Sequence, residues 1–340
     1  MTTLKLNLGD RGYDITVGSG TLKKACELMN LDRKVFIVTD SGVPKEYAEK
    51  VKAQAKEAMI FTVPEGEGSK SLSTLEEVLE TMLKFEMSRG DCAVAVGGGV
   101  VGDLTGFAAA TYMRGIDFYN VPTTLLSQVD SSIGGKTAVN LGGVKNIVGA
   151  FYQPKHVLID TDTLKTLPQR QISAGLSESV KMSLTSDREL FELFENENIT
   201  EENIETVIVR SLMIKRAVVE NDEKENGLRK ILNFGHTLGH GIEAEEKMHG
   251  FYHGECVALG MVPMCSSEVK ERLLPVLKKL DLPTEYNGDL DKALGFVIHD
   301  KKCRGGFVEA IFVDTVGNFR IKKISVGDFS KLVKERLNKL

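Results

Sequence analysis

The sequence predicts a chain of the α/β plus all-α class. An N-terminal doubly wound parallel-sheet nucleotide-binding domain should precede a C-terminal, mostly helical metal-binding domain. Three observations favour this: strand-like and helix-like segments alternate in the first half, a glycine turn joins a buried strand to a helix, and helical periodicity with clustered histidines follows. At about 150 residues per domain, the 340 residues suggest two domains. We expect them at 1–160 and 161–340, the second with a late β-hairpin.

The first half reads as βαβ alternation, which is typical of a parallel sheet covered by helices on both faces. KVFIVTD is a buried strand that ends in Asp40, and CAVAV is a second one before a glycine turn and a helix of small residues. The expected order is strand 34–40, helix 44–57, strand 58–64, helix 72–85 and strand 92–96.

The second half has helical periodicity and few strand signals. We expect helices in the segments 189–197, 202–222 and 292–302. Only 307–323, with Gly317 in its turn, looks like a hairpin.

Composition argues against nucleic acid or a membrane surface as the main partner. Lys plus Arg number 43 and Asp plus Glu number 48, a net charge of -5. The opening residues lack the apolar region of a signal peptide, and no stretch approaches the roughly 18 apolar residues of a membrane span. A cytoplasmic location is therefore expected. The cysteines form no CxxC pair, so we expect them reduced and buried: Cys26, Cys92, Cys256, Cys265 and Cys303.

The glycine turn indicates a nucleotide site. Gly97, Gly99 and Gly102 satisfy GxGxxG between a strand and a helix, where backbone N–H groups and the positive helix end can hold a pyrophosphate. Asp117 precedes the next expected strand, so Asp40 is the better ribose partner and the strand order should differ from the ordinary Rossmann one. The alternative, that these glycines only permit close packing of helix and strand, stays open.

Histidines cluster in residues 231–256, which hold four of the six in the chain. His236 and His240 are spaced i, i+4 and would share one helix face, to which His253 could return. Three such ligands with one open position are typical of a catalytic zinc. A single pair at this spacing often has no metal, and this one lacks the Glu of an HExxH helix.

Basic residues recur beside Gly, Asn or Asp, which suits a substrate carrying phosphate and carboxylate groups better than a solvated surface. Any one of them alone could face solvent. The sequence GGK at 134–136 meets the P-loop pattern only in part, because Asp130 stands at the first glycine position, and no P-loop is expected. The recurring cations are Arg114, Lys136, Lys145, Lys181, Lys215 and Arg229.

Longer motifs resemble one family. GGGVVGDLTGFAAATYMRGI, VPTTLLSQVDSSIGGKTAVN, KNIVGAFYQPK, SAGLSES and LNFGHTLGHGIE followed by HGECVALG are similar to the 3-dehydroquinate synthases, a family of sugar phosphate cyclases, over about residues 30–305. The resemblance implies NAD and a divalent metal, usually zinc with cobalt as an alternative, and a homodimer. It implies conversion of 3-deoxy-D-arabino-heptulosonate 7-phosphate, a small-molecule sugar phosphate of the shikimate pathway, to 3-dehydroquinate and phosphate. The steps are transient oxidation by NAD, β-elimination, re-reduction and aldol closure.

The resemblance replaces the i, i+4 pair as ligand set. It implies that Glu178, His236 and His253 bind the metal and that His240 is an active-site residue instead. Arg114 is implied to reach the phosphate site of a neighbouring subunit. The other implied catalytic or substrate-binding positions are Asp130, Lys136, Lys145, Asn146, Lys181, Lys215, Glu225, Arg229 and Asn233.

Cofactor positions follow from the same resemblance. They are Asp40, Glu67, Lys70, Gly99, Val100, Val101, Gly102, Asp103, Thr123, Thr124, Lys136, Lys145, Thr163, Leu164, Lys165 and Thr166. Gln171 stands where the family generally has Glu, and Gly42 where an Asn often contacts the adenosine. The motifs leave open whether Lys301 or Lys302 contacts substrate. They also leave rivals: a cyclase making 2-deoxy-scyllo-inosose or an epi-valiolone, and a metal-dependent polyol or glycerol phosphate dehydrogenase.

Overall fold

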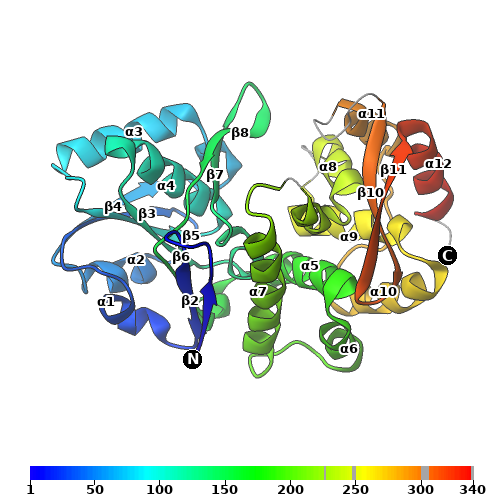
Figure 1. Ribbon diagram of the computed structural model, residues 1–340, viewed down its shortest axis with the longest axis horizontal. Helices are drawn as coiled ribbons and strands as arrows, with labels where there is room; N and C mark the ends of the chain where they lie inside the picture. Colours follow the sequence, from blue (N-terminus) through cyan, green and yellow to red (C-terminus); the bar gives the residue numbers. More distant parts are fainter. Residues whose placement is uncertain (226, 247–249, 300–305, 338–340) are drawn as a thin grey trace. The chain divides into compact units, whose positions relative to one another are not determined.

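The computed structural model describes residues 1–225, 227–246, 250–299 and 306–337 (Figure 1). The chain forms two compact units, Met1–Leu167 and Pro168–Leu340. Unit 1 contains the large sheet, and unit 2 is mostly helical, as the predicted fold class requires. Among the described residues, no helix is long and apolar enough to cross a membrane.

The sheet of unit 1 has seven strands in the order β1-β2-β9-β6-β5-β3-β4. Every neighbouring pair is parallel except β1 and β2, which form an antiparallel hairpin at one edge. In this order the bounds are Thr2–Leu6, Tyr13–Gly18, His156–Asp160, Asp117–Pro122, Cys92–Gly97, Lys34–Asp40 and Glu57–Val63.

The strand order reverses between β3 and β5. From β4 to β9 the order corresponds to 2-1-3-4-5, the flavodoxin-like arrangement, rather than 3-2-1-4-5-6. The expectation of a non-Rossmann order is therefore confirmed. In open sheets of this kind, ligands bind outside the carboxyl ends of the strands at the reversal point, which here lies between Asp40 and Gly97.

Helices cover both faces of this sheet because its strands alternate apolar side chains between two cores. Phe36 and Val38 of β3 pack with α3 (Leu72–Lys84) and α4 (Gly99–Thr111). Val35 and Ile37 pack on the opposite face with α1 (Ala25–Leu28) and α2 (Lys45–Lys52). Figure 1 shows α3 and α4 on one side of the strands and α1 and α2 on the other. Since both faces are covered, the central strands β3 and β5 are mostly apolar.

The structure corrects several predicted elements. The helix expected at 44–57 ends at Lys52, and Glu57 already belongs to β4. Asp117 is the first residue of β6 instead of preceding that strand. Two hairpins were not predicted, β1–β2 and the one formed by β7 (Lys136–Leu141) and β8 (Val144–Phe151).

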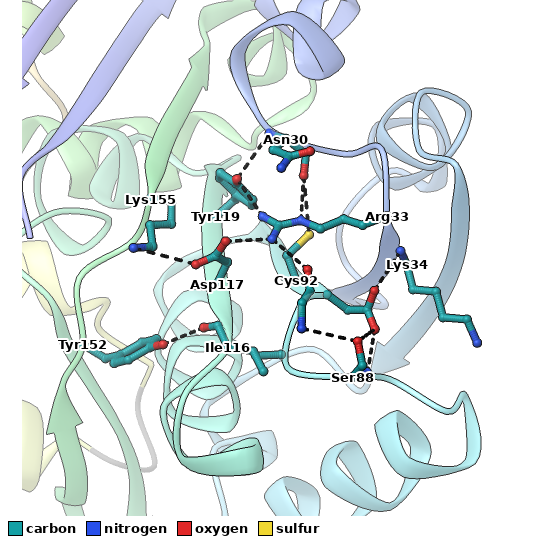
Figure 2. A network of polar contacts seen from close by, with 12 residues as sticks. Asn30, Arg33, Lys34, Ser88, Cys92, Ile116, Asp117, Tyr119, Tyr152 and Lys155 are labelled. Carbon is teal, nitrogen blue, oxygen red and sulfur yellow. Dashed lines mark hydrogen bonds and ion pairs between the residues drawn. The ribbon is translucent and has the colours of Figure 1, made fainter.

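A network of polar contacts lies at the amino-terminal ends of β5 and β6, opposite the carboxyl ends of the strands (Figure 2). The guanidinium of Arg33 donates to Asp117 at 2.7 Å and to the hydroxyl of Tyr119 at 2.9 Å. Lys155 adds an ion pair to Asp117 at 3.7 Å. Burial of the neighbouring Cys92 thiol raises its pKa to about 11, although Arg33 opposes that shift. These contacts hold the amino-terminal ends of β5 and β6 together. Ligands of open sheets bind at the carboxyl ends of the strands, which lie away from this network.

Unit 2 consists of helices and one hairpin. The expected hairpin is confirmed, with β10 (Phe307–Thr315) antiparallel to β11 (Asn318–Ser325). The helices are α5 (Gln169–Ser186), α6 (Arg188–Asn196), α7 (Ile204–Asn221), α8 (His236–Glu245), α9 (His253–Met261), α10 (Ser267–Lys279), α11 (Leu290–His299) and α12 (Val326–Arg336), with the 3-10 turn η6 (Leu228–Asn233).

The cysteines match the expectation only in part. Cys92, Cys256 and Cys265 are buried free thiols, but Cys26 is free and exposed, so its expected burial is wrong. Its position in α1 turns the side chain away from the apolar face that Ala25 and Met29 form. Cys303 lies outside the described residues.

Candidate functional site

Most of the expected cofactor residues of unit 1 lie at or just after the carboxyl ends of five strands, whereas Lys136 and Lys145 lie on the β7–β8 hairpin. Asp40 ends β3, and its Oδ1 accepts hydrogen bonds from the backbone N–H groups of Gly42 at 2.8 Å and Val43 at 3.2 Å. Burial raises the pKa of Asp40, against the effect of these hydrogen bonds. A Cβ atom at Gly42 would lie 2.6 Å from the side chain of Glu65. The carboxylate of Glu65 thus occupies the space that an Asn at 42 would need.

A buried ion pair lies at the same edge of the sheet. Lys70, 5% exposed, contacts Oδ2 of Asp103 at 2.6 Å and lies 3.9 Å from Oε1 of Glu67. The side-chain amide N–H of Asn140, on β7, donates to Oε1 of Glu67 at 2.8 Å. Oδ1 of Asn140 accepts a hydrogen bond from the backbone N–H of Asn146 at 2.9 Å. A cavity of about 340 Å³ lined by Pro64 and Ser69 lies beside this cluster. The cluster gathers predicted residues from three separate segments, Glu67 with Lys70, Asp103 and Asn146, together with Asn140.

The start of α4 is suited to an anion. Gly98 is the N-cap residue, and among the described residues no side chain caps this helix. The N–H groups of its first turn, at Gly99, Val100 and Val101, carry the positive end of the helix dipole. An added Cβ at Gly99 would lie 2.9 Å from Oγ of Ser131, so packing also restricts this position. The glycines can therefore serve both pyrophosphate binding and close packing. Gly102 lies in the same helix, and a Cβ added there would lie 3.3 Å from the side chain of Asn120.

Among the remaining cofactor candidates, Thr123, Thr163 and Leu164 are buried, while Lys165 and Thr166 are exposed. Thr123 donates its N–H to the carbonyl of Gly97 at 3.0 Å, and Thr124 Oγ1 accepts from the N–H of Ser127 at 3.3 Å. The hydroxyl of Thr163 donates to the Asp160 carbonyl at 2.8 Å. In the turn η5 (Thr161–Thr166), Leu164 is buried and Lys165 pairs with Asp162 at 3.0 Å, while Thr166 bonds Tyr47 at 2.8 Å.

The β7–β8 hairpin carries exposed cations. Lys136 begins β7, directly after the GG pair, so this segment enters a strand and not a helix, as the absence of a P-loop requires. Lys145 and Asn146 lie on β8, and both are exposed. Asp130 is in the short π-helical turn η4 (Ser127–Ser131). Arg114 is exposed, with a left-handed backbone at φ 67° between α4 and β6.

Unit 2 brings Glu178, His236 and His253 together from three helices. One ligand atom of each lies within 4.8 Å of the others. Nε2 of His236 is 3.7 Å, and Nε2 of His253 is 3.6 Å, from Oε1 of Glu178. The ring centroids of the two histidines are 5.1 Å apart. His240, one turn along α8 from His236, lies 5.3 Å from it by the same measure and forms a second close group with Glu243 and His253.

The carboxylate of Glu178 is fully buried, with 0% exposure, and neither oxygen has a hydrogen-bond partner among the described residues. Oε2 has only the ion pair with Lys181, whose contact lacks hydrogen-bond geometry. A buried charge without hydrogen bonds is costly unless another charge compensates it. Two imidazoles facing Oε1, with Nε2 atoms directed at it, form the N and O ligand set that zinc prefers. The residues therefore fit a divalent metal.

Each histidine has a partner for its other ring nitrogen. Nδ1 of His236 contacts the carbonyl of Phe234 at 3.1 Å, and Nδ1 of His253 contacts Oε2 of Glu243 at 3.2 Å. Burial lowers the pKa of His253, but the hydrogen bond and charge of Glu243 and the charge of Glu178 outweigh burial and raise it. Such contacts orient the rings and leave the Nε2 atoms for a metal.

The other unit 2 candidates surround η6. Lys181 is buried and donates to the Leu232 carbonyl at 2.7 Å. Asn233 donates to Oε1 of Glu225 at 2.7 Å. Lys215 on α7 and Arg229 on η6 are also buried, at 5% and 2% exposure. Lys181, Lys215 and Arg229 are thus three buried cations of unit 2. Lys301 and Lys302 lie outside the described residues.

Sequence reasoning missed two polar residues of these clusters, Asn140 and Glu243. Asn140 follows the GGK segment by four positions, but nothing in the sequence indicates the hairpin that turns it toward Glu67. Glu243 could have been found, because it lies seven residues after His236 and two helical turns place both on one face.

Comparisons with known proteins agree with this architecture. A 2-deoxy-scyllo-inosose synthase complexed with carbaglucose-6-phosphate, NAD+ and Co2+ is 29% identical, with a TM-score of 0.87 over 99% of this chain and 100% of that one. The 2-epi-5-epi-valiolone synthase of Streptomyces hygroscopicus, with NAD+ and Zn2+ bound, is 26% identical, with a TM-score of 0.85 over 95% and 96% of the two chains. The fold is thus that of the sugar phosphate cyclases.

Sequence comparison is more specific. Residues 60–174 match the family described as 3-dehydroquinate synthase N-terminal, and 175–303 match 3-dehydroquinate synthase C-terminal. A 3-dehydroquinate synthase of Streptococcus sanguinis is 42% identical over 98% of this chain and 99% of its own length. The chain belongs to the 3-dehydroquinate synthase family.

Proposed function

We propose that this chain converts 3-deoxy-D-arabino-heptulosonate 7-phosphate to 3-dehydroquinate and phosphate, as an NAD- and zinc-dependent carbon–oxygen lyase. The observation that carries the proposal is the convergence of His236 and His253 on the buried carboxylate of Glu178, which has no hydrogen-bond partner among the described residues. It occurs in a chain 42% identical to a 3-dehydroquinate synthase.

The two units divide the binding tasks. In unit 2, Glu178 and the Nε2 atoms of His236 and His253 would hold the metal. In unit 1, the first turn of α4 would receive the NAD pyrophosphate, because its N–H groups carry partial positive charge. Lys70 with Asp103 lies beside it, and Asp40 ends the strand at the reversal point. When bound, the metal supplies a Lewis acid and NAD supplies the hydride acceptor that is regenerated at the end of the cycle.

The polar side chains of this chain would bind and orient the substrate. Lys136, Lys145 and Asn146 suit the phosphate, since two ammonium groups and an amide attract its oxygens without fixing a single geometry. Lys215 and Arg229, which are buried cations, suit the carboxylate end. Asn233 and His240 would donate to oxygens that gain negative charge during phosphate elimination and ring closure. Glu225 holds Asn233 in place.

The elimination needs a proton acceptor but no outside oxidant. The substrate's own phosphate can take the proton from the carbon next to the transient ketone as the carbon–oxygen bond breaks. The chain's part is to hold the phosphate on its cations during this transfer. Because the hydride returns to the substrate, substrate and product differ by loss of phosphate and by ring closure, and no net oxidation occurs.

A homodimer belongs to the proposal. Arg114 is exposed and lies between α4 and β6, with a left-handed backbone conformation. A guanidinium in this position could bind phosphate oxygens bidentately in a second copy of the chain.

The test is turnover with purified protein, NAD and zinc. We expect phosphate release in step with a cyclic product identified as 3-dehydroquinate, without accumulation of NADH. Steady accumulation of NADH would instead indicate a polyol or glycerol phosphate dehydrogenase. Identification of the cyclic product as 2-deoxy-scyllo-inosose or an epi-valiolone would indicate one of the other sugar phosphate cyclases.

A further inference from the structure

His253 contacts a different carboxylate with each of its ring nitrogens. Nε2 lies 3.6 Å from Oε1 of Glu178, while Nδ1 lies 3.2 Å from Oε2 of Glu243. The side chains of His253 and Glu243 are 30% and 21% exposed, so water screens this contact only in part. The imidazole is therefore held between two anionic groups, of which only Glu178 belongs to the proposed ligand set.

The helix that carries Glu243 explains how it reaches this place. Glu243 lies on α8 two turns after His236, so both side chains project from one face of that helix. His253 is the first residue of α9, which packs against α8. One helix face thus provides a ligand, His236, and a carboxylate directed at the next ligand, His253. Glu245, two positions further along, instead contacts Tyr286 at 2.8 Å and Lys292 at 3.2 Å.

The close group of His240, Glu243 and His253 could also be taken for a second cation site. Its geometry argues against this. A neutral imidazole that binds a metal through Nε2 carries its proton on Nδ1, and this proton is what a carboxylate 3.2 Å away would accept. A second cation on Nδ1 would have to displace that proton and lie close to the first cation. A single metal with an orienting carboxylate needs neither.

We propose that Glu243 is a positioning residue for the metal centre, a role that rests on the proposed function. It accepts the Nδ1 proton of His253, fixes the tautomer that leaves Nε2 for the metal, and increases the basicity of that nitrogen. The carbonyl of Phe234 does the same for His236 with a neutral acceptor, at 3.1 Å. The two histidines are therefore unequal ligands, and His253 is the stronger electron donor.

The test measures metal affinity and not activity alone. Cobalt would replace zinc, its affinity would be determined by competition with a chelator, and its visible absorption would report the ligand field. Loss of a partner of this kind typically weakens metal binding 10- to 100-fold. We expect Glu243→Ala to weaken cobalt binding by about this factor and to shift the absorption bands. Glu243→Gln, which keeps an acceptor oxygen without its charge, should restore part of the affinity.

Glu245→Gln is the matched control on the same helix and should leave affinity and spectrum unchanged. Unchanged cobalt affinity and spectrum in folded Glu243→Ala would overturn the proposal. So would two equivalents of cobalt in the wild type and one in Glu243→Ala, because that result indicates a second cation site. If Glu178→Gln also keeps full cobalt affinity, the proposed metal site itself is wrong. If Glu178→Gln weakens cobalt binding but Glu243→Ala does not, only the proposed positioning role of Glu243 is wrong.

Discussion

Lys181 forms an ion pair with Glu178 one turn away on α5, although both side chains are buried at 1% and 0% exposure. The ammonium contacts Oε2 of the carboxylate, whereas Oε1 faces His236 and His253. Each oxygen thus has its own electrostatic partner. Breaking a buried ion pair by removing one partner typically costs several kcal/mol. The residues on this face of α5 are therefore restricted by the ion pair as well as by packing.

The first prediction separates a metal ligand from an active-site histidine on the same helix. His236→Ala should lose most of its bound metal and its activity, because one of three protein ligands disappears. His240→Ala, one turn away, should keep its metal and lose turnover. Metal content by elemental analysis, with thermal unfolding as the folding control, distinguishes them. Stoichiometric zinc in His236→Ala would refute the ligand assignment.

The second prediction concerns the N-terminus of α4. Gly99→Ala alone is ambiguous, because the new Cβ would lie 2.9 Å from Oγ of Ser131. Ser131→Ala removes that contact, and its hydroxyl has no hydrogen-bond partner among the described residues. The double variant should therefore fold normally yet bind NAD more weakly, since the Cβ blocks close approach of the pyrophosphate.

NAD affinity would be measured by fluorescence titration, with Ser131→Ala as the control. If the folded double variant binds NAD as the control does, the glycines serve packing and the pyrophosphate lies elsewhere.

The third prediction concerns Arg114. Its replacement by Ala should lower kcat/KM about 10- to 100-fold, since a charge-assisted phosphate contact contributes about 1.5 to 3 kcal/mol. Arg114→Lys should recover only part of this loss, because an ammonium lacks the bidentate geometry. Metal content should not change in either variant.

The subunit origin of Arg114 has its own readout. Mixing Arg114→Ala with His236→Ala should restore some activity, because a hybrid dimer pairs an intact metal site with an intact arginine. No recovery, with subunit exchange confirmed, means that the arginine acts within its own chain or does not contact substrate.

The fourth prediction concerns stability and pH. Asp187 caps α6 through the N–H of Leu190 at 3.0 Å and accepts two hydrogen bonds from Arg210, at 2.7 and 2.9 Å. Burial alone would raise the pKa of Asp187, but these hydrogen bonds and the charge of Arg210 hold it below its usual value. Asp187→Ala should lower the free energy of unfolding by about 2 to 3 kcal/mol near neutral pH.

The pH dependence follows from the lowered pKa in the folded state. The contribution of Asp187 is fully present above the unfolded pKa of about 3.9 and is lost as the pH falls through the lower folded value. Denaturant unfolding at several pH values should therefore show the wild type and Asp187→Ala converging in acid. A constant difference down to the lowest pH would contradict this account.

Local sequence patterns predicted the elements whose signal is local. The strand 34–40 has the predicted bounds because an unbroken apolar, β-branched run fits only a strand buried on both faces. The helix that follows this strand, expected at 44–57, was predicted too long. Ala53 to Lys56 favour helix in isolation, yet the N–H of Lys56 bonds the carbonyl of Leu31 at 3.1 Å, and this tertiary contact starts β4.

The candidate site was harder to predict because its partners are distant in the sequence. Spacing alone pairs His236 with His240, and only family resemblance brings in Glu178, which lies on α5. The structure places Glu178 beside His236 and His253, a proximity that helical periodicity cannot reveal. No motif points to Asn140, whereas the seven-residue spacing from His236 could have indicated Glu243.

The most direct test of the central claim is a crystal structure of the zinc-loaded protein with anomalous diffraction recorded at the zinc edge. The account predicts one strong peak about 2.0 to 2.2 Å from a carboxylate oxygen of Glu178 and from Nε2 of both His236 and His253. A peak among His240, Glu243 and His253, or no peak within bonding distance of Glu178, would contradict it.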